Sequence, residues 1–139
     1  MFFKKKFDNE SYNELLDLYK DFNKLCNEFS ADCLISSRIL GNYDKTNLVK
    51  ILFLMIESNM MTILSLIITI NGFNDKEHVK FIGEQCKKRG DKCNNYIPPL
   101  SSIDEIIVSD ILKDKAYAMI NIYSKFIDKS YLFLDKARF

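Results

Sequence analysis

A run of side chains spaced alternately three and four residues apart constrains the fold of this chain more than any other feature. Only an α-helix brings residues at that spacing onto one stripe, which a neighbouring helix can then cover. The run predicts a helix from Ser11, which has the spacing of a capping box with Glu14, to Gly41, a natural C-terminal stop. A break near residues 30–32 is the alternative. The members of the run are Tyr12, Leu15, Tyr19, Phe22, Cys26, Phe29, Cys33, Ser36 and Leu40.

The stretch from Leu48 to Ile70 is the most apolar part of the chain and predicts a second long helix, with Asp44 as its N-cap and an end before Gly72. Apolar residues occupy nearly every face of this helix, so we expect it to be the central helix that the others surround. Its remaining stripe is small and polar, which permits close approach of a neighbouring helix or, alternatively, lines a polar groove. That stripe consists of Ser58, Thr62, Ser65 and Thr69.

The same stretch is long enough to span a bilayer, but Lys50, Glu57 and Asn59 interrupt it. We therefore interpret it as a buried core helix and expect no membrane span. The N-terminal lysines at 4–6 are followed by Phe7 and acidic residues rather than by the apolar segment of a signal peptide. These features predict a cytoplasmic protein, either in the cell that produces it or in a host cell.

A third helix is predicted to begin at Asn74, with Glu77 completing its cap. Gly90 either ends this helix or weakens it. A linker at about residues 94–101 follows, because Pro98 and Pro99 cannot continue a helix. We expect one face of the third helix to carry His78, Phe81, Ile82, Gln85 and Cys86.

A fourth helix restarts where Ser102 and Glu105 repeat the capping spacing, and it runs towards Leu134 with a bend at the charged residues 113–115. No alternating strand pattern of convincing length is present. The sequence therefore predicts an all-α, single-domain helical bundle over residues 1–139, with about four long helices, a central apolar helix and a flexible segment at 1–8.

Composition agrees with one globular core, since 47% of the 139 residues are hydrophobic and 28% are charged. The net charge of +1 provides no global field for nucleic acid, although residues 8–44 hold eight acids against three bases and make the first helix acidic. Lysine, isoleucine and asparagine are abundant while arginine is rare, a bias that indicates an AT-rich genome such as that of a low-GC bacterium, a phage or a virus.

The four cysteines form two pairs with identical spacing, Cys26 with Cys33 and Cys86 with Cys93. Seven residues make two helical turns, about 10.5 Å, which is too far for a disulfide within one helix. The spacing is also wider than that of zinc knuckles. We therefore expect buried thiols in a reducing compartment, with a metal site or a disulfide between helices as the alternative.

Groups for catalysis are scarce, since the chain has one histidine, His78, and no glycine-rich phosphate loop. One histidine cannot supply the repeated ligands of a di-iron bundle. The sequence thus predicts a protein that is not an enzyme and that uses no cofactor or metal. Glu57, the only acid between Leu48 and Ile70, must be paired, protonated or turned to solvent, and its candidate partners are Lys50, Arg38 and His78.

Two candidate binding sites remain. Tyr12, Tyr19 and Phe22 lie on the first-helix run, and the nearby acids Asp17 and Asp21 could guide a basic protein partner, although packing in the core is the alternative role of the aromatics. The basic residues near the end of the third helix could contact the phosphates of a nucleic acid, or they could simply be solvated and favoured by the helix dipole. These residues are Lys87, Lys88, Arg89 and Lys92.

Two resemblances concern architecture. Residues 41–44, followed by the stretch from Leu48 to Ile70 with Glu57 inside, resemble the turn and long central helix of HEPN-type bundles from bacterial and phage conflict systems. The arginine-then-histidine signature of their nucleases is missing after Arg38 and Arg89, which puts ribonuclease activity in doubt. In length, cysteine usage and helical content the chain is also similar to the tail-less Bcl-type signalling inhibitors of poxviruses.

The leading interpretation is a non-enzymatic protein-interaction module that binds a partner protein or a second copy of itself, of the kind that a virus or phage uses to modulate a host factor. The first alternative is a HEPN-like bundle that binds or cleaves RNA, centred on residues 87–89 and His78. A second alternative is a viral Bcl-type inhibitor, and a third is a small-molecule sensor that uses the serine and threonine stripe of the second helix.

Overall fold

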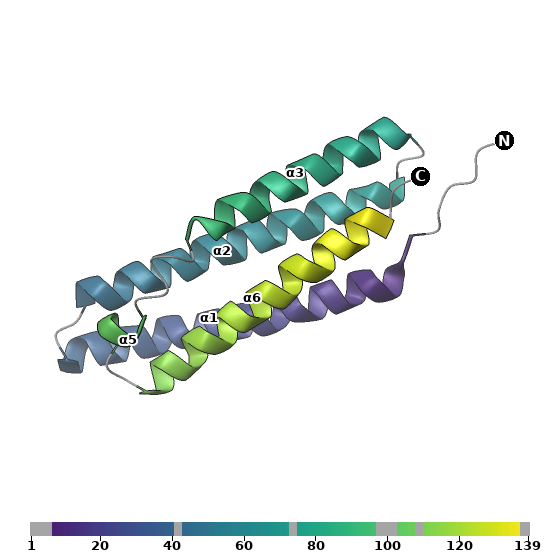
Figure 1. Ribbon diagram of the computed structural model, residues 1–139. Coiled ribbons are helices and arrows are strands. Elements are labelled where there is room, and N and C mark those ends of the chain that lie inside the picture. The colour runs from purple at the N-terminus through teal and green to yellow at the C-terminus, as the bar shows by residue number, and fades with distance from the viewer. Residues whose placement is uncertain (1–6, 41–42, 73–74, 97–102, 108–109, 137–139) are drawn as a thin grey trace.

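A computed structural model describes residues 7–40, 43–72, 75–96, 103–107 and 110–136 (Figure 1). Four long helices account for most of these residues, and no strand is found among them. The prediction of an all-α helical bundle is confirmed. The helices are α1 (Asn9–Leu40), α2 (Tyr43–Thr69), α3 (Lys76–Asn94) and α6 (Asp110–Lys136), with a 3-10 turn η1 (Ile70–Gly72) and a short α5 (Ile103–Ile106) between them.

The four long helices lie side by side as an elongated bundle (Figure 1). Helix α1 packs along both α2 and α6, and α2 packs along α3. Helices α3 and α6 meet over a shorter stretch, where Tyr123 and Tyr131 reach Gly90. Helix α2 therefore lies between α1 and α3, as expected for a central helix, but the bundle is less closed along the α3–α6 side.

Aromatic rings from facing helices fill the centre of the bundle. Phe53 of α2 packs edge-to-face against Phe29 and Phe22 of α1, with ring centroids 5.4 and 6.3 Å apart. Phe126 of α6 is also fully buried. Each of these rings removes a large apolar area from water, which is the main favourable contribution to folding.

The start of α1 differs from the expectation. Asp8 caps the helix, because its Oδ1 accepts a hydrogen bond of 3.0 Å from the Ser11 amide and its Oδ2 accepts one of 2.6 Å from the Ser11 hydroxyl. Phe7 packs edge-to-face against Phe133 with ring centroids 5.3 Å apart. Of the segment predicted to be flexible, residues 7 and 8 make these contacts, and residues 1–6 lie outside the described residues.

The start and the buried face of α3 also differ from the expectation. Asp75 is the N-cap, with its Oδ1 accepting from the Glu77 amide at 2.9 Å, and the predicted cap Asn74 lies outside the described residues. The buried face consists of Val79, Ile82, Cys86, Gly90 and Cys93, whereas the expected members Phe81 and His78 are exposed.

Gly90 neither ends nor interrupts α3, which continues to Asn94. A Cβ at this position would collide with the hydroxyl of Tyr131 on α6, so the absence of a side chain leaves room for the end of the Tyr131 ring. The glycine serves helix packing rather than helix termination.

The fourth predicted helix is in fact two helices, α5 and α6. Ile107, which follows α5, is 1% exposed, whereas Ile111, four residues on, is 65% exposed. A continuous helix would place both side chains on one face. The chain instead breaks between them, so that Ile103 and Ile107 enter the core before α6 begins.

Candidate functional site

The aromatic residues of the predicted α1 site belong to the core. Phe22 is fully buried, and Tyr12 and Tyr19 are half-buried and pack against the core cluster. These rings therefore take the alternative role of core packing and leave little aromatic surface for a partner. Asp17 and Asp21 are exposed, as a site for a basic partner would require.

Other acids of α1 hold α6 in place. The Lys115 ammonium of α6 lies 2.6 Å from Asp32 and 3.7 Å from Glu28, and Lys129 lies 3.0 Å from Glu14. The hydrogen bond that Lys115 donates to Asp32 raises the pKa of Lys115 above its ordinary value. Three acids of α1 are thus paired with lysines of α6 in the same chain, although Glu14 remains 52% exposed.

Glu57 is bonded into the interface between α1 and α2. Its Oε1 accepts hydrogen bonds from the Asn23 amide at 2.8 Å and from the Tyr19 hydroxyl at 3.5 Å. Burial and then the Glu57 charge raise the pKa of Tyr19, and the same two causes raise the pKa of the Cys26 thiol to about 12. The acid that looks most unusual in the sequence therefore joins two helices through polar neutral partners. The side chain of the candidate partner Arg38 lies outside the described residues.

All four cysteines are buried and unpaired, which confirms the expectation of buried thiols. Burial raises the pKa to about 12 for Cys26 and Cys86 and to about 11 for Cys33 and Cys93. A thiol with so high a pKa is a poor nucleophile, because the thiolate is the reactive form. In the part of the chain that the structure describes, no three His, Cys, Asp or Glu side chains are grouped so as to hold a metal ion.

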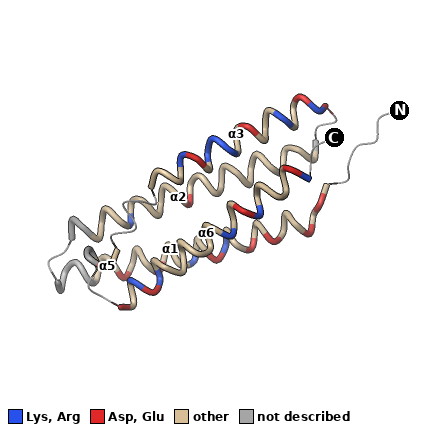
Figure 2. The backbone as a smooth tube through the Cα atoms, in the orientation of Figure 1, with Lys and Arg blue, Asp and Glu red and all other residues tan. Residues whose placement is uncertain are grey.

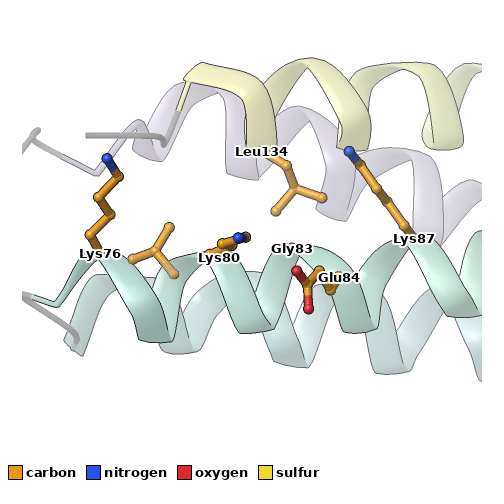
Figure 3. Close-up of a pocket in the computed structure, with 7 residues that line it drawn as sticks. Lys76, Lys80, Gly83, Glu84, Lys87 and Leu134 are labelled. Atoms are coloured by element: carbon orange, nitrogen blue, oxygen red, sulfur yellow. The ribbon is translucent and has the colours of Figure 1, made fainter.

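The predicted basic site on α3 is divided between different faces. Lys87 lines a pocket of about 500 Å³ beside α6, whereas Lys88, Arg89 and Lys92 are exposed and do not line it (Figure 3). Successive residues of a helix point about 100° apart, so residues 87–89 cannot share one face. His78 pairs with the cap residue Asp75 at 2.9 Å and is exposed, away from this pocket.

Lys87 is joined at the pocket by two lysines that the sequence reasoning missed, Lys76 and Lys80. Together they follow a spacing of four and then seven residues, which places them on one stripe of a helix. That spacing was the available signal. The contiguous basic run at 87–89 is the more conspicuous pattern, but its residues do not share one face of the helix.

A large apolar surface lies on α2, on the side that none of the other described helices covers. Six large apolar residues there are each between 39% and 56% exposed, and two exposed serines lie among them. We define the α2 open face as Leu48, Ile51, Leu54, Met55, Ser58, Met61, Ser65 and Ile68. Helices α1 and α3 flank α2, as expected for a central helix, but they cover only part of its circumference and leave this face open in the described structure.

The α2 open face carries no charge. From Thr46 to Thr69 the charged residues of α2 are Lys50 and Glu57 (Figure 2), and the Glu57 carboxylate turns towards α1. The hydroxyls of the serine and threonine stripe bond back to their own helix, with Thr62 donating to the Ser58 carbonyl and Ser65 to the Met61 carbonyl, each at 3.0 Å. The stripe therefore needs no polar partner, which argues against a polar groove.

Six residues of the α2 open face repeat the alternating three- and four-residue spacing that defines the core side of α1. They are Ile51, Leu54, Ser58, Met61, Ser65 and Ile68. Contiguous apolar surface of this kind marks an interaction site in a folded protein. By length and composition, helix α2 from Thr46 to Thr69 could also cross a membrane. In its most apolar 18-residue stretch, 44% is buried in the bundle.

Comparison of the chain with protein-family models, with curated proteins and with solved structures finds no match.

Proposed function

We propose that this protein is a non-enzymatic protein-interaction module, that the α2 open face is its interface, and that a second copy of the chain binds there. The observation that carries the proposal is the uncharged apolar seam on α2, exposed along the length of the helix. An exposed seam with alternating three- and four-residue spacing is the surface by which one helix packs along another.

The spacing of the seam fits an antiparallel copy of itself. If a two-fold axis passes between positions 59 and 60, Ile51 faces Ile68 of the other copy. The same axis places Leu54 opposite Ser65, and Ser58 opposite Met61. In two of these three pairs a large side chain faces a small one, and the symmetry makes each contact twice. This complementarity favours a second copy over an unrelated helix, for which the register would be accidental.

The apolar area suits a reversible dimer. Fully burying a leucine, isoleucine or methionine contributes about 1.5–3 kcal/mol. The six large residues of the α2 open face are roughly half exposed, so covering them contributes several kcal/mol for each protomer. Association itself costs at least about 4 kcal/mol. We therefore expect a dimer whose population rises with concentration.

The first test is the molar mass in solution, measured by light scattering with size exclusion over a wide range of concentration. The mass should rise from 16.3 kDa towards twice that value. Met61→Lys should remain a monomer, because the lysine would lie within an apolar interface; Met61 is 56% exposed, so the fold should tolerate it. Ile111→Lys is the matched control, since Ile111 is 65% exposed on α6 and lies outside the interface. This variant should dimerise normally.

Disulfide trapping tests the register. Leu54→Cys combined with Ser65→Cys should cross-link two chains under mild oxidation, whereas Leu54→Cys alone should not, because in the antiparallel register it faces Ser65 and not its own copy. The native thiols are buried and have raised pKa values, so they should not form disulfides under these conditions.

Two results would overturn the proposal. One is a wild-type protein that stays at 16.3 kDa at the highest concentration. The other is a Met61→Lys variant that still dimerises. A monomer that floats with neutral phosphatidylcholine vesicles, and loses this binding with Met61→Lys, would assign the α2 open face to a membrane surface instead.

A further inference from the structure

We propose that the pocket between α3 and α6 binds an amphipathic anion, a molecule in which a phosphate or carboxylate headgroup is joined to an alkyl chain. The pocket shares no residue with the α2 open face, so this inference does not depend on the proposed dimer. It rests on three features of the pocket: its positive charge, its apolar floor and its empty space.

The charge comes from three lysines on one stripe of α3. Lys76 and Lys87 extend from α3 towards α6 on opposite sides of the pocket, and Lys80 lies between them (Figure 3). Among the described residues, none of the three has a carboxylate within 4.0 Å, although Glu84 also lines the pocket. By contrast, Lys115 and Lys129 of α6 are paired with acids of α1. The lysines of the pocket are thus available to an anion.

The floor is apolar. Val79 of α3 and Leu134 of α6 are 4% and 5% exposed and face the pocket between the lysines. Gly83 completes the floor, and a Cβ placed on it would have no atom within 4 Å. A bare phosphate would make no use of this surface, whereas an alkyl chain laid along it would be removed from water.

The volume and shape agree with a small ligand. About 500 Å³ is within the usual range for pockets that bind small molecules, which combine an apolar lining with a few polar groups that orient the ligand. Lysines suit this role, because an ammonium group can donate charge-assisted hydrogen bonds to phosphate or carboxylate oxygens at the pocket rim.

A nucleic acid fits the same residues less well. Lys88, Arg89 and Lys92 do not line the pocket, so the positive charge of α3 does not form one track for a phosphate backbone. Tyr96, the nearby aromatic residue that could stack a base, is half-buried and packs against the core. Without a stacking platform, single-stranded recognition would lose one of its two usual contributions.

The test is isothermal titration calorimetry of the full chain with dodecyl phosphate, below its micelle concentration, alongside dodecanol and inorganic phosphate. Dodecyl phosphate should bind with one molecule per chain, and each of the other two should bind at least about tenfold more weakly, since each lacks one half of the recognised chemistry. Dodecanoate serves as a second probe that shows whether the headgroup must be a phosphate.

Three variants test whether dodecyl phosphate binds in this pocket. Lys80→Glu should weaken dodecyl phosphate binding by about tenfold or more, whereas Lys88→Glu, the same charge reversal outside the pocket, should leave it nearly unchanged. Gly83→Leu should abolish binding by filling the pocket. Leucine favours a helix more than glycine does, so this variant should melt no lower than the wild type, and circular dichroism checks that it folds.

Several outcomes would overturn the inference. Dodecanol binding as tightly as dodecyl phosphate would leave no role for the lysines, and inorganic phosphate binding as tightly would leave none for the floor. Unchanged binding by a folded Gly83→Leu variant would place the probe elsewhere. A nucleic acid would be favoured instead if the protein retained a short single-stranded RNA and did not bind dodecyl phosphate. In that case Lys80→Glu and Lys88→Glu should weaken RNA binding equally.

Discussion

The two described glycines inside α3, Gly83 and Gly90, should respond in opposite ways to the same substitution. Exchanging glycine for alanine inside a helix stabilises a protein by about 1 kcal/mol, because the helix is then less costly in backbone entropy. At Gly83 nothing opposes this gain, since an added Cβ meets no atom within 4 Å. We therefore expect Gly83→Ala to raise the free energy of unfolding by about 0.5–1 kcal/mol.

At Gly90 the added Cβ would overlap the hydroxyl oxygen of Tyr131. The next nearest atoms, the ring Cζ of Tyr131 at 3.4 Å and Cδ1 of Ile127 at 3.6 Å, are at ordinary contact distances. Overpacking of this kind costs about 1–3 kcal/mol. After the gain in helix propensity is subtracted, Gly90→Ala should lower the free energy of unfolding by about 1 kcal/mol.

A second substitution isolates the cause. Tyr131→Phe removes the colliding hydroxyl and keeps the ring, so the double variant Gly90→Ala with Tyr131→Phe should recover most of the lost stability. The double-mutant cycle should then give a favourable coupling of about 1 kcal/mol or more. Urea unfolding followed by far-UV circular dichroism measures all four free energies. If Gly90→Ala stabilises as much as Gly83→Ala, or if Tyr131→Phe rescues nothing, the close approach of α3 and α6 at this point is refuted.

Two further predictions concern buried polar groups. The Asn59 side chain is buried, and its Oδ1 accepts no hydrogen bond in the described structure. Asn59→Leu should therefore raise the free energy of unfolding by about 1 kcal/mol. A lower thermal midpoint for this variant would show that the Asn59 amide is satisfied. Burial raises the pKa of the Cys86 thiol from 9.0 to about 12, so the folded state favours the neutral form, and the resulting stability is complete below pH 9 and lost as the pH rises towards 12. Between pH 9 and pH 12 the free energy of unfolding should decline less steeply for Cys86→Ala than for the wild type. An unchanged slope would contradict the raised pKa of the Cys86 thiol.

Much of the fold follows from local patterns. The three- and four-residue spacing of α1 and the unbroken apolar length of α2 predict helices with little ambiguity, because no other backbone conformation brings such residues onto one stripe. The burial of the cysteines follows from the same periodicity, since Cys26 and Cys33 lie on the stripe that a neighbouring helix covers. These properties depend on residues close together in the chain.

Helix ends depended on more distant contacts. Asp8 lies three residues before Ser11, and Asp75 lies next to Asn74, so each helix had more than one plausible cap. At α1 the choice of Asp8 goes with the packing of Phe7 on Phe133, at the other end of the sequence. The break before α6 likewise follows the burial of Ile103 and Ile107 in a core built by other helices.

The candidate sites show the same division. The sequence alone determined that α2 is apolar on nearly every face, and for that reason it could not indicate which face α1 and α3 leave uncovered. The stripe of Lys76, Lys80 and Lys87 can be read from the spacing, but the spacing does not show that Leu134 of α6 joins these residues in lining a pocket. Periodicity determines which residues share a face of a helix, whereas tertiary packing decides what that face meets, because packing depends on side chains far apart in the chain.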